Sequence, residues 1–229
     1  MHAHTFRDRS DAGRQLATEL RAREEPGGDA VVLALPRGGV PVGYEVAVAL
    51  NLPLDVCVVR NLGVPGQPEL AMGAIASGGV QVLNSSVVEM MEIGNDEVAA
   101  IAERERRELE RRELAYRGDA PPLDVERRTV IVVDDGLATG ATMLAAIRSL
   151  RARRAGPILV AVPVAPKETV RRIANAADEV VCLLMPEPFG SIGAFYLSFA
   201  QLGDDDVRYL LAEAARRHDE RRSSFAVPQ

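Results

Sequence analysis

The sequence has no tryptophan, and aromatic residues make up only 4% of its 229 positions. A core must therefore be built mostly from valine, leucine, isoleucine and alanine, and the hydrophobic fraction of 47% is ordinary for a globular protein. No apolar run reaches the ~18 residues that a membrane-spanning helix needs. The first residues, MHAHTFRDRSDAGRQ, also lack the apolar stretch of a signal peptide. We therefore expect one sizeable domain in the cytoplasm and no membrane partner.

A basic excess is also absent, since the net charge is −6 and the pI is about 5.2. A chain with this balance does not attract nucleic acid through its overall charge, so no nucleic-acid partner is expected. The two cysteines, Cys57 and Cys182, lie inside apolar runs, which predicts buried reduced thiols rather than a disulfide. His2, His4 and His218 lie near the termini without ligand spacing, so we expect surface histidines and no metal ligands among them.

Short runs rich in valine and isoleucine alternate with amphipathic segments along the chain. Near-continuous apolar strands are buried on both faces, so the pattern predicts an α/β fold, a mostly parallel sheet with helices on both faces. Strands are expected at Val31–Leu35, Leu54–Arg60, Thr129–Asp134, Ile158–Val164 and Val180–Leu184, and helices from the PRGG turn to Leu50, at Ala141–Arg154 and at Lys167–Ala177.

Further elements flank this core. A helix is expected over residues 10–23, capped by Ser10. Gly78-Gly79 predicts a tight hairpin turn, and the Gly and Pro residues of 61–70 predict a long loop. We expect a single domain over residues 1–229, with a helical insertion at 84–128 and a C-terminal hood and helix segment at 185–229.

Residues 95–117 predict one long helix of alternating charge. The pairs Glu103–Arg107 and Glu108–Arg112 place an acid four residues before a base, which is the favourable order on a helix. A helix that binds nucleic acid or a partner would fit this pattern. The internal charge balance favours a solvated charged face instead.

The segment VIVVDDGLATGATM at residues 130–143 carries the clearest chemistry. Ligands of an open α/β sheet bind beyond the carboxyl ends of the strands, and free N–H groups at a helix start attract anions. Asp134 and Asp135 beside such a phosphate site suit a ligand whose vicinal hydroxyls lie near its phosphate, as in a 5-phosphoribosyl group. The residues expected at the phosphate are Ala138, Thr139, Gly140, Ala141 and Thr142.

Other phosphate-binding loops fit this segment less well. A Walker A loop needs a Gly-Lys-Ser/Thr sequence, and Gly136–Thr142 contains no lysine. The glycine spacing of a dinucleotide fingerprint is also missing. A plain strand, turn and helix with a polar rim is the alternative without function, and Thr-Gly-x-Thr after two acids argues against it.

The segment resembles the motif of type I phosphoribosyltransferases that binds 5-phosphoribosyl-1-pyrophosphate (PRPP), in which four apolar residues precede two acids and then Thr-Gly. The resemblance runs from Phe6 to about Leu211. PRGGVPVG, VPGQPELAMGA and the surroundings of Phe195-Tyr196 are similar to a bacterial group described as phosphoribosyltransferase-like proteins. The resemblance implies that the chain has the fold of that family and that it binds PRPP together with Mg²⁺.

The resemblance also implies residues for the pyrophosphate. Arg37, Gly38 and Gly39 match the family's pyrophosphate loop, where glycines turn N–H groups outward and an arginine offers a bidentate fork. A tight turn with a surface arginine is the alternative. Arg60 would be a second cation at the leaving group. The family pattern places a lysine next to it, where this chain has Asn61.

The implied reaction is transfer of the phosphoribosyl group to a nucleobase or similar small acceptor. Asp134 and Asp135 would fix the ribose and stabilise positive charge at its C1 atom. Arg37, Arg60 and the Mg²⁺ carried by PRPP would stabilise the departing pyrophosphate, so no dedicated protein cage for the metal is expected. Residues 61–70 correspond to a mobile lid that excludes water.

The acceptor is less defined. Ala138 stands where hypoxanthine–guanine enzymes carry an acid, which disfavours that acceptor class. Aromatic rings after the last strand could stack a base or could pack the C-terminal helix onto the sheet, and Phe189 is the leading candidate for stacking. The others are Phe195, Tyr196 and Phe199.

Three functional classes follow. The first is a phosphoribosyltransferase, a pentosyl-transferring glycosyltransferase of nucleotide metabolism. The second is a catalytically weak PRPP-sensing regulatory protein, which Asn61 and the undefined acceptor site keep open. The third is a hydrolase of phosphoribosyl compounds. Dimers are common in the family, so the resemblance also carries the expectation of a homodimer.

Overall fold

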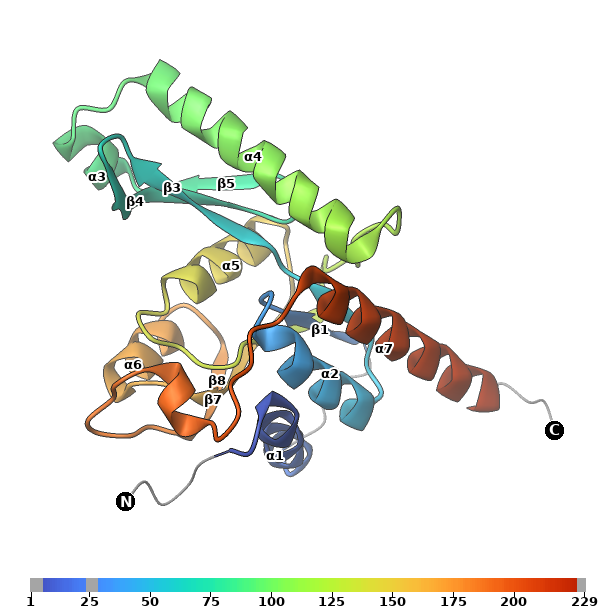
Figure 1. Ribbon diagram of the computed structural model, residues 1–229. Coiled ribbons are helices and arrows are strands. Elements are labelled where there is room, and N and C mark those ends of the chain that lie inside the picture. Colours follow the sequence, from blue (N-terminus) through green and yellow to red (C-terminus); the bar gives the residue numbers. More distant parts are fainter. Residues whose placement is uncertain (1–5, 24–28, 226–229) are drawn as a thin grey trace.

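The computed structural model describes residues 6–23 and 29–225, and a parallel five-stranded sheet forms its centre (Figure 1). The strand order is β2-β1-β6-β7-β8, and every neighbouring pair is parallel. The carboxyl ends of the strands therefore meet at one edge. The strands are β1 (Ala30–Ala34), β2 (Leu54–Val56), β6 (Thr129–Val133), β7 (Ile158–Val164) and β8 (Glu179–Leu184).

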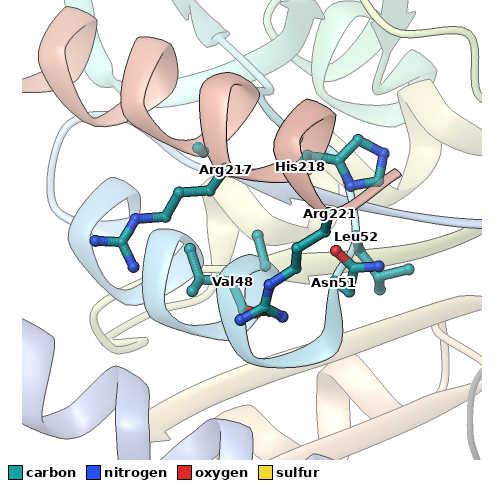
Figure 2. Close-up of a pocket in the computed structure, with 8 residues that line it drawn as sticks. Val48, Asn51, Leu52, Arg217, His218 and Arg221 are labelled. Carbon is teal, nitrogen blue, oxygen red and sulfur yellow. Dashed lines mark hydrogen bonds between the residues drawn. The ribbon is translucent and has the colours of Figure 1, made fainter. Parts of the chain in front are cut away.

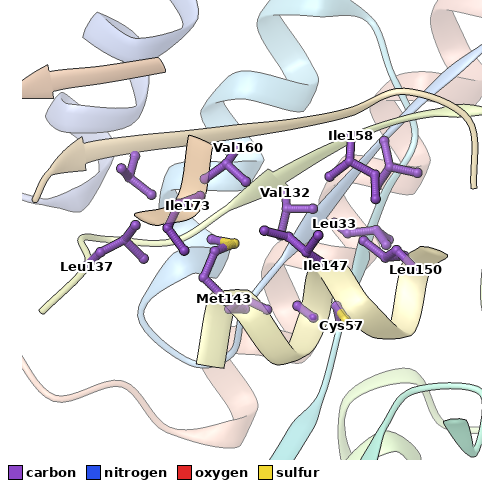
Figure 3. Close-up of a cluster of buried hydrophobic side chains, with 14 of the residues drawn as sticks. Leu33, Cys57, Val132, Leu137, Met143, Ile147, Leu150, Ile158, Val160 and Ile173 are labelled. Carbon is purple, nitrogen blue, oxygen red and sulfur yellow. The ribbon is translucent and has the colours of Figure 1, made fainter. Parts of the chain in front are cut away.

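Helices cover both faces of this sheet, as the apolar strands predict. On one face α1 (Arg9–Arg21) and α2 (Gly39–Leu50) bury Leu16 and Val46 against Val32 of β1. On the other face, α5 (Ala141–Ala152) and α6 (Lys167–Ala174) pack on the remaining side chains of the same strands. Figure 3 shows this second cluster, which includes Leu33, Val132, Met143, Ile147 and Ile173.

A smaller antiparallel sheet stands apart from the first, in the order β3-β4-β5. It consists of β3 (Val59–Val64), β4 (Gln67–Ala76) and β5 (Val80–Leu83), and α3 (Ser85–Met90) follows it. The long helix α4 (Asn95–Arg117) covers its outer face (Figure 1). The predicted hairpin at Gly78-Gly79 is confirmed, since these residues join β4 to β5. The fold class expected from the sequence is confirmed as well.

Two predictions between residues 54 and 70 are wrong. The strand expected at Leu54–Arg60 is two strands, because β2 ends at Val56 and β3 belongs to the smaller sheet. The loop expected over residues 61–70 is mostly the β3–β4 hairpin. The Gly and Pro residues of this segment indicated a structureless loop. They occur instead in an irregular hairpin, in which the strand register shifts on both sides of Gly63.

The helices match their predictions better. The helix expected at 95–117 is α4, with Glu103–Arg107 at 3.1 Å and Glu108–Arg112 at 2.8 Å. The cap predicted at Ser10 is wrong. Asp8 precedes the helix, and its carboxylate accepts a hydrogen bond from the Asp11 N–H at 2.7 Å. The last elements of the described residues are a short 3-10 turn, η1 (Ile192–Phe195), and α7 (Asp204–Phe225).

Both cysteines are free thiols, and burial raises the pKa of Cys57 to about 12. His2 and His4 lie outside the described residues. His218, expected at the surface, is half-buried where α7 crosses the end of α2 (Figure 2). Its Nδ1 and the Oδ1 of Asn51 have no hydrogen-bond partner among the described residues. They line a hollow of about 10 Å³, room for one water molecule.

No helix in residues 6–23 and 29–225 is long and apolar enough to cross a bilayer.

Candidate functional site

Two loops leave the carboxyl edge of the sheet side by side, because β1 and β6 are neighbours. Ala34 and Val133 are paired at the ends of these strands, and the Leu35 N–H donates to the Val133 carbonyl at 2.9 Å. The first loop runs through the cis Pro36–Arg37 peptide to α2, and the second runs from Asp134 to α5. The structure thus brings the predicted pyrophosphate loop against the predicted ribose-phosphate segment.

The contact between these loops requires glycine. A Cβ atom on Gly39 would lie 2.7 Å from the Val133 carbonyl oxygen and 2.8 Å from Asp134 Cα. One on Gly38 would overlap the carboxylate of Asp135. Any side chain here would push the two loops apart, so Gly38 and Gly39 set their spacing.

The turn into α5 is open on its outer side and anchored beneath. Its residues Ala138, Thr139, Ala141 and Thr142 are exposed. Gly140 precedes α5 with φ 70° and offers no side-chain cap; the Ala141 N–H donates a long hydrogen bond to Thr139 Oγ1 at 3.4 Å, and the next N–H groups of the first turn are left for an anion.

The anchor beneath this turn comes from α6. The Thr169 hydroxyl donates to the Ala138 carbonyl at 2.7 Å, and Thr169 is buried. A Cβ atom on Gly140 would lie 2.9 Å from Thr169 Cγ2, so the turn rests directly on this side chain. Sequence analysis did not identify Thr169, because nothing in the local pattern links it to the turn 31 residues earlier.

Asp135 is held by a residue from the start of the chain. Arg9 Nε donates to Asp135 Oδ2 at 2.7 Å, and Arg9 Nη1 donates to the Ala200 carbonyl at 2.8 Å. The Arg9 guanidinium lies 3.7 Å from the ring centre of Phe199, a cation–π contact. Sequence analysis did not single out Arg9 either, since 126 residues separate it from Asp135.

The C-terminal segment also reaches Asp135. The Tyr196 hydroxyl donates to the Asp135 carbonyl at 2.6 Å, and burial raises the pKa of this phenol. Tyr196 and Phe195 are both buried, so these rings pack the fold. Phe189, the predicted stacking residue, is half-buried and stacks on Phe195 with ring centres 5.5 Å apart.

Asp134 has a different environment. It is half-buried, and its Oδ1 accepts a hydrogen bond from the Asp135 N–H at 2.8 Å. No arginine or lysine of the described residues forms an ion pair with it. Burial, and then the charge of Asp135, raises the pKa of Asp134 well above its ordinary value. Burial also raises the pKa of Asp135, and Arg9 partly offsets that rise.

The two predicted arginines differ in availability. Arg37 lies in the first loop and is 43% exposed, with Asp204 of α7 at 3.8 Å. Arg60 is engaged elsewhere, because its Nε and Nη2 donate to Glu105 Oε2 of α4 at 2.9 and 2.6 Å. The structure thus leaves Arg37 in the loop whose glycines contact the aspartates, with its side chain near Asp204, and ties Arg60 to the contact between β3 and α4.

A divalent cation would find few protein ligands here. The described residues contain no group of three or more His, Cys, Asp or Glu side chains suited to a metal. The Asp134 carboxylate forms no ion pair with the described residues, so an Mg²⁺ at this edge would be held mainly by the phosphate oxygens of a ligand.

These features define an α/β domain with an exposed turn at the start of α5 and paired carboxylates at its carboxyl edge. The chain belongs to the phosphoribosyl transferase domain family, whose model matches residues 6–197. The family predicted from the sequence is thereby confirmed.

Individual relatives agree. Two Mycobacterium tuberculosis proteins (strains CDC 1551 and H37Rv), whose names assign them provisionally as phosphoribosyl transferases, are each 47% identical over 211 residues, or 92% of this chain. The chain spans about half of their length, 47%. A crystal structure from Thermus thermophilus is 42% identical with a TM-score of 0.83, and the match covers 91% of this chain and 98% of that one.

Proposed function

We propose that this protein binds PRPP with Mg²⁺ and transfers its 5-phosphoribosyl group to a nucleobase or similar small acceptor, releasing pyrophosphate. The observation that carries this proposal is the contact between the two loops. It places an uncapped helix start, two carboxylates and an arginine-glycine turn side by side at one sheet edge.

Each part of PRPP then has a place. The 5′-phosphate would bind the exposed turn at Ala138–Thr142, where free N–H groups and two hydroxyls meet it. The ribose would lie beside the carboxylates of Asp134 and Asp135. The pyrophosphate would bind the turn of Arg37, Gly38 and Gly39, and Arg37 is exposed enough to form a bidentate contact.

The chemistry follows from these positions. The acceptor nitrogen forms a bond to C1 and loses its proton to water, the C1–oxygen bond to pyrophosphate breaks, and both bonding electrons leave with the pyrophosphate. Negative charge of the aspartates stabilises the positive charge that develops on the ribose. Arg37 stabilises the leaving group, and Arg60 could join it only after leaving Glu105. Bound Mg²⁺ would supply charge neutralisation on the phosphates.

The test is release of pyrophosphate from Mg²⁺–PRPP in the presence of a nucleobase panel. Release that depends on one acceptor, together with formation of its ribonucleotide, supports the transferase. Asp134→Asn should abolish it, because the amide cannot replace a charged acceptor. Asp124→Asn, at an exposed loop position, is the matched control. Absence of PRPP binding in the native protein would refute the proposal.

One observation favours a second candidate, a PRPP-sensing regulatory protein. Arg60 is committed to Glu105, and Asn61 follows it, so the pyrophosphate lacks a second free cation in this arrangement. Tight Mg²⁺–PRPP binding without turnover on any acceptor would support this candidate. Pyrophosphate release without an acceptor would instead indicate a hydrolase.

A further inference from the structure

We propose that Arg9 is a positioning residue of the phosphoribosyl site, which holds Asp135 against the pyrophosphate loop and leaves Asp134 to accept the ribose hydroxyls. This inference rests on the proposed function and assigns different roles to Asp134 and Asp135.

Three contacts fix the Arg9 side chain, two hydrogen bonds and one cation–π contact. Nε donates to Asp135 Oδ2 at 2.7 Å, Nη1 donates to the Ala200 carbonyl at 2.8 Å, and the guanidinium lies on the ring of Phe199. Only 12% of the Arg9 side chain is exposed. A guanidinium fixed in this way has one orientation, so it also fixes the carboxylate that it binds.

Asp135 is in turn closed in by the pyrophosphate loop. Its side chain is 10% exposed, and its carboxylate lies so close to Gly38 Cα that no Cβ fits between them. The Tyr196 hydroxyl holds the backbone of Asp135 from another side. Little of Asp135 is left for a ligand, whereas its carboxylate packs against Gly38 at the end of the loop from β1 to α2 and so helps to set the position of that loop.

Asp134 is the complementary case. It forms no ion pair with the described residues, and its Oδ1 accepts a hydrogen bond from the Asp135 N–H. A ribose with vicinal hydroxyls could satisfy its remaining acceptor positions. The two adjacent aspartates therefore divide between ligand contact and loop placement.

The division predicts a difference between two ligands. Ribose 5-phosphate shares the phosphate and sugar of PRPP but has no pyrophosphate, so it does not need the loop at Gly38. Arg9→Met should weaken Mg²⁺–PRPP binding by roughly 10-fold or more, while ribose 5-phosphate affinity changes by less than about 2-fold. Asp135→Asn should behave in the same way. Asp134→Asn should weaken both ligands.

The measurement is isothermal titration calorimetry of each full-length variant with both ligands. Arg14→Met is the matched control, because Arg14 lies on the same helix, is 49% exposed and pairs with Glu45. Arg9→Lys keeps the charge without the planar fork, and we expect it to recover only part of the PRPP affinity. Combined with Asp135→Asn, Arg9→Met should have little further effect, because both changes release the same loop.

The outcomes separate the two proposals. If the native protein binds neither ligand, the proposed function fails. If the native protein binds both, but Arg9→Met weakens both equally or leaves both unchanged, Arg9 does not position the pyrophosphate loop. Additive losses in the double variant would overturn the shared mechanism of Arg9 and Asp135.

Discussion

Arg60 of β3 binds Glu105 of α4 through two nitrogens on a single carboxylate oxygen, at 2.9 and 2.6 Å. The Glu105 side chain is only 10% exposed, and Arg104 donates to its other oxygen at 3.1 Å. The pair fastens the long helix to the smaller sheet. It also removes from the solvent an arginine that the sequence had suggested for the leaving group.

Glu105→Gln is expected to lower the free energy of unfolding by about 1–3 kcal/mol, because it leaves Arg60 half-buried without its counter-charge. The measurement is urea unfolding at neutral pH. Glu108→Gln is the control on the same helix. Its ion pairs with Arg111 and Arg112 are more exposed, so we expect a loss of only about 0.5 kcal/mol. Equal losses in the two variants would show that burial of Glu105 adds nothing.

Arg60→Met tests the other role of the same arginine. We expect it to destabilise the fold like Glu105→Gln and to leave the Kd of Mg²⁺–PRPP nearly unchanged. A variant that keeps its stability but releases pyrophosphate more slowly would contradict this expectation. It would show that Arg60 stabilises the departing pyrophosphate.

The exposed turn at Ala138–Thr142 gives a separate prediction. Thr139→Val and Thr142→Val each remove one exposed hydroxyl; Thr142→Val should leave folding unaffected, and Thr139→Val loses only a long hydrogen bond from the Ala141 N–H, so its effect on stability should be small. Each is expected to weaken PRPP and ribose 5-phosphate alike, by roughly 10-fold, since a hydrogen bond to a charged phosphate is lost. Thr18→Val, at an exposed position of α1, should change neither affinity. A loss confined to PRPP would place the 5′-phosphate elsewhere.

Asp134→Asn should make the fold more stable while it weakens ligand binding. Burial and the charge of Asp135 raise the pKa of Asp134 in the folded protein above its value of 3.8 in the unfolded chain. The folded state therefore loses stability as the pH rises from about 4 through the raised pKa. The gain from the uncharged amide should be larger at about pH 8 than at about pH 5 in urea unfolding. A less stable variant at both pH values would show that ionised Asp134 is well solvated.

The thiols provide a check on the core. Burial raises the pKa of Cys57 to about 12 and that of Cys182 to about 11, so neither should form a reactive thiolate at neutral pH. An aromatic disulfide reagent should label the native protein slowly and both cysteines at once after unfolding in guanidinium. Rapid labelling of native Cys57 would mean that the cluster in Figure 3 opens readily.

The sequence by itself determined the parallel sheet and the turn that leads from β6 into α5. Both follow from local order, because a mostly apolar strand, two acids and a Thr-Gly turn follow one another closely along the chain. The predicted start of α5 at Ala141 and the bounds of α4 were correct for the same reason. Periodicity and turn chemistry act over a few residues, so a sequence shows them directly.

Only the tertiary structure decided what surrounds the two aspartates. Arg9 and Tyr196 come from opposite ends of the chain, and both converge on Asp135. Whether Arg60 faces a ligand or Glu105 depended on the break between β2 and β3, which sends the chain into a second sheet. Contacts between residues so far apart in the sequence depend on how the helices and the two sheets pack against one another. Asp134 and Asp135 are adjacent and of the same type, but the fold gives an ion pair with Arg9 to Asp135 alone.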